Sequence, residues 1–166
     1  VMGTQIGKII NGSKLICVEA NPSYKPIIEN NLSVNGIDNF TVISSAISTS
    51  HDKISFSTGK SNIVGRIVDN SSNTNSFISV PALSLSSLLL TEGIKEFSLV
   101  CDIEGSEVDI ILNDSSSLDN CKFIVIETHR TVLKGVDYTP NKIKEKLINL
   151  GFSLIAQYGV VMVFEK

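Results

Sequence analysis

Three carboxylates in this sequence come directly after runs of apolar residues. They are Glu19, Asp102 and Glu127. Short runs that are apolar on both faces are typical of buried parallel strands, and ligands bind beyond the carboxyl ends of such strands. The sequence therefore predicts a ligand site at the edge of a sheet where these three acids gather.

Glu19 suggests the most specific chemistry of the three. A carboxylate at the end of an early strand can accept hydrogen bonds from both hydroxyls of an adenosine ribose. The same position also suits a solvated acid near a helix N-terminus. Ribose binding is compatible with NAD as well, but a dinucleotide-binding oxidoreductase would need a Gly-x-Gly-x-x-Gly loop, which we do not find in this sequence.

His129 lies two residues after Glu127, so the two side chains project to the same side if the strand continues. An imidazole in that position could take the proton from an acceptor hydroxyl. The alternative is a structural histidine at a strand end. These two residues could also join Asp102 and Glu104 in a site for Mg, Mn or Fe, but the spacing matches no specific metal motif and we expect no metal.

The elements that must position these residues alternate between strands and helices, which predicts an α/β protein with a mostly parallel sheet. The expected strands lie near 14–19, 41–44, 97–102, 123–128, 152–158 and 160–165. The last two are separated by Gly159 and predict an antiparallel pair at the C-terminus. Residues 51–82 predict a hairpin-like excursion that includes a Ser- and Asn-rich loop at 70–75.

Composition limits the class of protein further. The chain has 166 residues, 42% of them hydrophobic, and we expect a single domain over 1–166. A net charge of -3 without a basic patch argues against a nucleic-acid substrate. No apolar run approaches the roughly 20 residues that span a bilayer, so we expect a cytoplasmic protein that does not bind membranes. Cys17, Cys101 and Cys121 are expected to be reduced thiols.

Several segments together resemble one family, the FkbM-type methyltransferases that depend on S-adenosylmethionine. The matching positions are Asn31 and the segments 18–22, 35–36, 45–48, 80–85, 102–107 and 126–127. The most specific is Asp-x-Glu-Gly-x-Glu at 102–107, and the similarity extends from about Leu15 to Phe164. The resemblance implies a Rossmann-like methyltransferase fold, S-adenosylmethionine as cofactor, and O-methylation of a small-molecule or sugar-like acceptor, with a homo-oligomer left open.

The resemblance also implies roles for individual residues. Glu19 matches the ribose-binding acid, and Asn21, which lies beside it, is also expected to bind the cofactor. Ser45 and Ala46 match the stretch that borders the adenine.

Asp102 and Glu104 match the motif beside the place where the methionine moiety meets the acceptor. We therefore expect Asp102 to serve both cofactor and acceptor, and His129 to be the catalytic base. Arg130–Thr139 is expected to form a loop that acts as a partial lid.

The sequence departs from the family pattern in two places. The family opens with an apolar strand and an Asp-x-Gly-Ala-Asn-x-Gly loop, whereas here no strand precedes Gly3 and the residues up to Gly7 fit the helix after that loop. We expect the first strand and the glycine loop to be missing, which leaves a gap between the strands that end at Glu19 and Asp102. Val100 also stands where the family often has Lys. A noncatalytic methyltransferase-like binding or assembly domain is the alternative.

Overall fold

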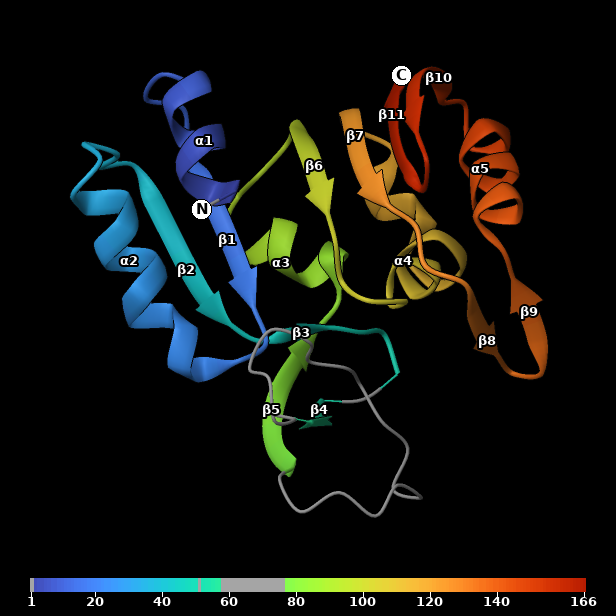
Figure 1. Ribbon diagram of the computed structural model, residues 1–166, viewed down its shortest axis with the longest axis horizontal. Coiled ribbons are helices and arrows are strands. Elements are labelled where there is room, and N and C mark those ends of the chain that lie inside the picture. Colours follow the sequence, from blue (N-terminus) through green and yellow to red (C-terminus); the bar gives the residue numbers. More distant parts are fainter. Residues whose placement is uncertain (1, 51, 58–76) are drawn as a thin grey trace. The chain divides into compact units, whose positions relative to one another are not determined.

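Figure 1 shows the computed structural model, which describes residues 2–50, 52–57 and 77–166. The Ser- and Asn-rich segment 70–75 lies outside the described residues. The chain divides into two compact units. Unit 1 comprises Val1–Ala46 and His51–Ala82, and unit 2 comprises Ile47–Ser50 and Leu83–Lys166.

Unit 1 contains a parallel pair of strands joined by a helical crossover. Strand β1 (Leu15–Glu19) pairs with β2 (Phe40–Ser44), with Glu19 opposite Ser44. The crossover consists of η1 (Pro22–Tyr24) and α2 (Lys25–Ser33), and a proline at the first position of η1 costs no backbone hydrogen bond. The predicted strand, helix and strand order is confirmed here.

Helix α1 (Met2–Ile9) approaches its neighbours closely because it carries two glycines. A Cβ on Gly7 would lie 2.5 Å from Cδ1 of Ile37, and one on Gly3 would lie 3.2 Å from Sγ of Cys17. The prediction that residues 3–7 belong to a helix is confirmed. The core of unit 1 beneath α1 and α2 contains Leu15, Leu32, Ile37 and Val42.

The excursion after β2 forms a second sheet of three strands. They are β3 (Ala46–Ile47), β4 (Lys53–Ser57) and β5 (Phe77–Leu83), in the order β3-β5-β4. Strands β4 and β5 run antiparallel, which confirms the predicted hairpin-like pairing.

Unit 2 is built on a mixed sheet with the order β10-β11-β7-β6. Strands β6 (Phe97–Cys101) and β7 (Cys121–Glu127) are parallel, whereas β11 (Val161–Glu165) runs antiparallel to both β7 and β10 (Ser153–Tyr158). The predicted C-terminal pair is confirmed, with Gly159 in its turn at φ 58°.

The expectation of one mostly parallel sheet needs a correction. Among the strand pairings described, parallel pairing is found at β1–β2, which form a sheet of their own, and at β6–β7, to which β11 and β10 add antiparallel, so the α/β architecture is mixed. Strands β1 and β6 belong to different sheets and do not pair, which agrees with the predicted gap between the strands that end at Glu19 and Asp102. The reason for the difference is local, because strands joined by short turns can only pair antiparallel.

Two helices of unit 2 begin after a hydroxyl side chain that caps their first turn. Helix α3 (Leu85–Thr91) starts after Ser84, whose hydroxyl accepts a hydrogen bond from the backbone N–H of Ser87. Helix α4 (Glu107–Asn113) is followed by η2 (Ser115–Leu118), and α5 (Pro140–Asn149) follows Thr139. Helix α5 lies against both α4 and β10 (Figure 1). The buried residues of this unit include Val108, Ile110, Ile124, Ile126, Ile143, Leu147, Met162 and Phe164.

Residues 130–139 were expected to form a loop, but the structure shows a hairpin. Strands β8 (Thr131–Leu133) and β9 (Val136–Tyr138) are antiparallel. Lys134 and Gly135 between them both have positive φ, 50° and 77°, as two-residue hairpin turns require. Arg130 spans the hairpin with two hydrogen bonds of 2.9 Å to the carboxylate of Asp137.

The three cysteines are free, as expected. Burial raises the pKa of Cys121 to about 11, despite the opposing effect of hydrogen bonds and of Lys166. Burial also raises the pKa of Cys101, and the charges of Glu107 and Asp102 add to that increase. These two thiols are therefore inert groups of the core.

Candidate active site

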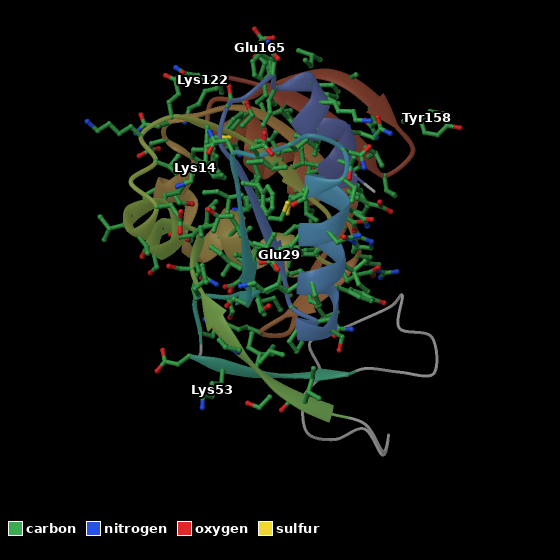
Figure 2. All side chains as sticks on the ribbon, turned by 90° about the vertical axis from the view of Figure 1, so that its left-hand side faces the viewer. Lys14, Glu29, Lys53, Lys122, Tyr158 and Glu165 are labelled. Atoms are coloured by element: carbon green, nitrogen blue, oxygen red, sulfur yellow. The ribbon has the colours of Figure 1, made fainter. Side chains whose placement is uncertain are left out.

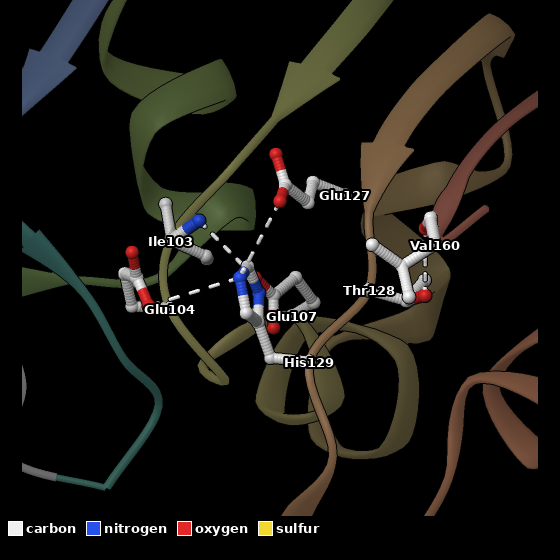
Figure 3. Close-up of polar contacts among 7 residues, drawn as sticks. All are labelled: Ile103, Glu104, Glu107, Glu127, Thr128, His129 and Val160. Atoms are coloured by element: carbon white, nitrogen blue, oxygen red, sulfur yellow. Dashed lines mark hydrogen bonds and ion pairs between the residues drawn. The ribbon is translucent and has the colours of Figure 1, made fainter. Parts of the chain in front are cut away.

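His129 lies just beyond the carboxyl end of β7, where the backbone is held in place by Thr128. Thr128 is 1% exposed, and its N–H and its hydroxyl both donate to the carbonyl of Val160, at 3.0 and 2.8 Å. The side chains of the two residues that flank Thr128 lie close together. Nε2 of His129 is 3.9 Å from Oε1 of Glu127 (Figure 3). The prediction that Glu127 and His129 project to the same side is confirmed.

Two carboxylates face the Nε2 side of the His129 ring, and a third, Asp102, belongs to the same cluster. Besides Glu127, Oε2 of Glu104 lies 3.7 Å from Nε2 (Figure 3). Asp102, Glu104 and His129 offer ligand atoms that all lie within 4.8 Å of one another. The residues predicted for the acceptor side thus come together in unit 2, and the arrangement also fits the metal alternative.

The opposite ring nitrogen contacts Glu107, the first residue of α4. Oε1 of Glu107 lies 3.0 Å from Nδ1 of His129 and also accepts the backbone N–H of Ile103 at 3.1 Å. Glu107 is 0% exposed, and among the described residues its Oε2 has no hydrogen-bond partner. In the sequence, Glu107 is marked only as the last residue of the Asp-x-Glu-Gly-x-Glu motif. Its position at the start of an apolar helix, where a buried acid needs a partner, is the signal that could have singled it out.

The surrounding carboxylates raise the pKa of His129. Burial lowers the pKa of the imidazole, but the hydrogen bond to Glu107 and the charges of Glu107, Glu104 and Asp102 outweigh it. The pKa of His129 therefore lies above its ordinary value of 6.5. The ring becomes a stronger base, and it stays protonated to a higher pH than a free imidazole.

The turn from β6 into α4 brings the Asp-x-Glu-Gly-x-Glu motif to this cluster with an unusual backbone. Glu104 has φ 55° and Gly105 has φ 104°. Positive φ is uncommon for a residue with a side chain and often occurs at functional sites. A Cβ on Gly105 would collide with Oγ1 of Thr131, so the motif and the hairpin β8–β9 are in close contact.

Gly105→Ala is expected to destabilise the protein by about 1–3 kcal/mol, because the substitution combines a φ that alanine rarely adopts with the collision at Thr131. Chemical denaturation of both proteins measures the difference. Gly159→Ala is the matched control, since Gly159 also has positive φ but no atom of the described residues lies within 4 Å of its Cβ position. A loss for Gly105→Ala no larger than that of the control would contradict this packing.

Glu19, the predicted ribose-binding acid, lies in unit 1 at the end of β1 and is partly exposed. Its Oε1 accepts the backbone N–H of Asn21 at 2.8 Å. The side chain of Asn21 is 5% exposed and accepts the N–H of Ser23, which caps η1. Asn21 therefore holds the chain that follows β1, and the Glu19 carboxylate keeps access to solvent.

Ser45 and Ala46, predicted to border the adenine, have side chains that point into unit 1. Ser45 is 2% exposed, its N–H donates to the carbonyl of Glu19 and its hydroxyl donates to that of Pro81 at 2.9 Å. Ala46 is 5% exposed and belongs to a core cluster with Ile54 and Val80. Their role toward the adenine stays a prediction, and it would have to involve backbone atoms.

Glu19, Asp102 and Glu127 lie at the carboxyl ends of β1, β6 and β7, which is the end of parallel strands where α/β proteins bind their ligands. The Methyltransferase FkbM domain matches residues 6–154 of this chain, and the chain belongs to that family. The match runs through both units. No curated protein and no solved structure gives a significant match. No helix among the described residues is long and apolar enough to cross a membrane.

Proposed function

We propose that this chain is an S-adenosylmethionine-dependent methyltransferase that methylates a hydroxyl oxygen of a small-molecule or saccharide acceptor. Its membership of the FkbM family supports methyl transfer. The single observation that carries the hydroxyl chemistry is the Glu107–His129 contact of 3.0 Å, which offers an oriented base beside Asp102 and Glu104. A hydroxyl needs such a base, because it must lose its proton as it attacks.

The side chains present fit this cofactor. Glu19 is a partly exposed carboxylate at a strand end, the arrangement that accepts both ribose hydroxyls. S-adenosylmethionine supplies an electrophilic methyl group on a positively charged sulfur. The acids of unit 2, foremost Asp102 and Glu104, favour a positive charge near them.

When bound, S-adenosylmethionine would supply the methyl group. The acceptor oxygen would bond to the methyl carbon as its bond to sulfur broke, and the electron pair would stay on the sulfur of the departing S-adenosylhomocysteine. The hydroxyl proton passes to Nε2 of His129. Asp102 and Glu104 orient the acceptor, and most of the rate enhancement comes from this positioning. The hairpin β8–β9 would partly cover the acceptor, as a lid does.

Two measurements on the full chain test the proposal. Calorimetry is expected to show binding of S-adenosylmethionine, and incubation with methyl-labelled cofactor and a panel of saccharides and small alcohols is expected to yield labelled ethers and S-adenosylhomocysteine. Amine acceptors of similar size serve as the control and should stay unlabelled. Cofactor binding without transfer to any acceptor would favour the noncatalytic alternative, and labelling of the amines would contradict the hydroxyl assignment.

A further inference from the structure

We propose that Glu107 is a positioning residue that holds the Nδ1–H of His129 and so leaves the lone pair of Nε2 free to accept a proton. The catalytic meaning of this inference rests on the proposed function. Its structural content, a single tautomer of His129 set by Glu107, does not.

The geometry requires the proton to be on Nδ1. A carboxylate can only accept, so the 3.0 Å contact between Oε1 of Glu107 and Nδ1 of His129 needs a hydrogen on Nδ1. A neutral imidazole carries one N–H, and its other nitrogen is then an acceptor. The backbone N–H of Ile103 donates to the same Oε1 at 3.1 Å and keeps the carboxylate from rotating away.

The burial of Glu107 makes this contact strong. The side chain is 0% exposed, and on the inner side it lines a small internal space together with Leu99 and Cys101. Its Oε2 has no partner among the described residues. A buried charge with so few partners is stabilised by a nearby cation, and His129 becomes one when Nε2 takes the proton. Glu107 therefore favours the imidazolium that the transfer produces.

The other acids act on His129 differently. Glu104 and Glu127 lie 3.7 and 3.9 Å from Nε2, beyond hydrogen-bond distance, and are 33% and 40% exposed. Glu104 and Asp102 favour the protonated ring through their charge, and Glu127 lies within ion-pair distance of Nε2. They do not compete for Nδ1. Without Glu107, however, they would be the nearest acceptors and would draw the proton of the neutral ring to Nε2, which would block the base.

Nitrogen-15 NMR of the full chain tests the tautomer directly. The only other histidine is His51, and the background variant His51→Asn leaves one imidazole to observe. We expect the neutral ring to carry its hydrogen on Nδ1 in the wild-type background and on Nε2 in Glu107→Leu. Glu127→Gln is the matched control, because it removes a carboxylate from the other nitrogen and should keep the hydrogen on Nδ1.

A second variant covers the case in which Glu107→Leu does not fold. Glu107→Gln keeps the shape of the side chain and an acceptor oxygen but removes the charge. Loss of a neighbouring negative charge disfavours the imidazolium, so the titration midpoint of His129 should fall relative to wild type. A merely structural Glu107 would change the unfolding temperature but leave both the midpoint and the tautomer as they are, which would overturn the inference.

Kinetics separate this inference from the proposed function. With a methylated acceptor in hand, kcat of Glu107→Leu should fall about 10²–10⁴-fold with KM nearly unchanged. If wild type transfers methyl groups and Glu107→Leu keeps its kcat despite a switched tautomer, the inference fails and the function stands. If the tautomer switches although no protein transfers methyl groups, Glu107 still positions His129 and the proposed function fails.

Discussion

Replacing His129 with alanine is expected to lower kcat for methyl transfer about 10²–10⁴-fold. Glu107 anchors the Nδ1 of this imidazole, and its Nε2 lies beside Glu104 and Glu127. Affinity for S-adenosylmethionine should stay close to wild type, because the imidazole acts on the acceptor. Steady-state kinetics and calorimetry measure the two quantities separately.

The same assignment predicts the pH dependence of the reaction. The base works only when unprotonated, so kcat should rise with pH through the pKa of His129. Because the surrounding carboxylates raise that pKa above 6.5, the midpoint should also lie above 6.5. This rise should be absent in His129→Ala. If His129→Ala keeps near-normal methyl transfer between about pH 6 and 9, the base role of His129 is ruled out and orientation is left as the source of catalysis.

Two controls make the result specific. Tyr158→Phe removes a hydroxyl from a side chain that is 89% exposed and projects outward in Figure 2, and it should match wild type. The assay is repeated in EDTA, because Asp102, Glu104 and His129 could also hold a divalent cation. Activity lost in EDTA and restored by Mg²⁺ or Mn²⁺ would support the metal alternative against the base.

Replacing Glu19 with alanine is expected to weaken binding of S-adenosylmethionine by about 1.5–3 kcal/mol, roughly 10–150-fold. A carboxylate that accepts both ribose hydroxyls would be lost, and nothing else in its place could accept them. Calorimetry on the folded variant gives the affinity. Because Glu19 also accepts the N–H of Asn21, circular dichroism must first show that the fold is kept.

Glu29→Ala is the matched control for this experiment. Glu29 is another acid of unit 1, on the exposed side of α2 (Figure 2). Its Oε1 lies 3.8 Å from Nζ of Lys25. Its loss changes the net charge by the same amount and should leave cofactor affinity unchanged. Equal affinity for wild type and Glu19→Ala would disprove the ribose role.

Local sequence patterns were sufficient for most of the individual elements. The apolar runs before Glu19 and Glu127 predict β1 and β7 because buried strands need apolar residues on both faces. Ser84 predicts the start of α3 because its hydroxyl satisfies a free N–H of the first turn. The hairpin β8–β9 was missed because strands of three residues are too short to show an alternating pattern.

The order of the strands, by contrast, follows from tertiary packing. β6 and β7 are parallel neighbours, so the motif after β6 lies beside His129, although Glu107 and His129 are 22 residues apart. No local pattern encodes that distance, since it depends on how the two strands and α4 bury their apolar side chains together. Burial likewise turned the side chains of Ser45 and Ala46 inward. The sequence therefore predicts which acidic residues lie at strand ends, whereas the contacts of these residues follow from the packing of strands and helices that are distant in the chain.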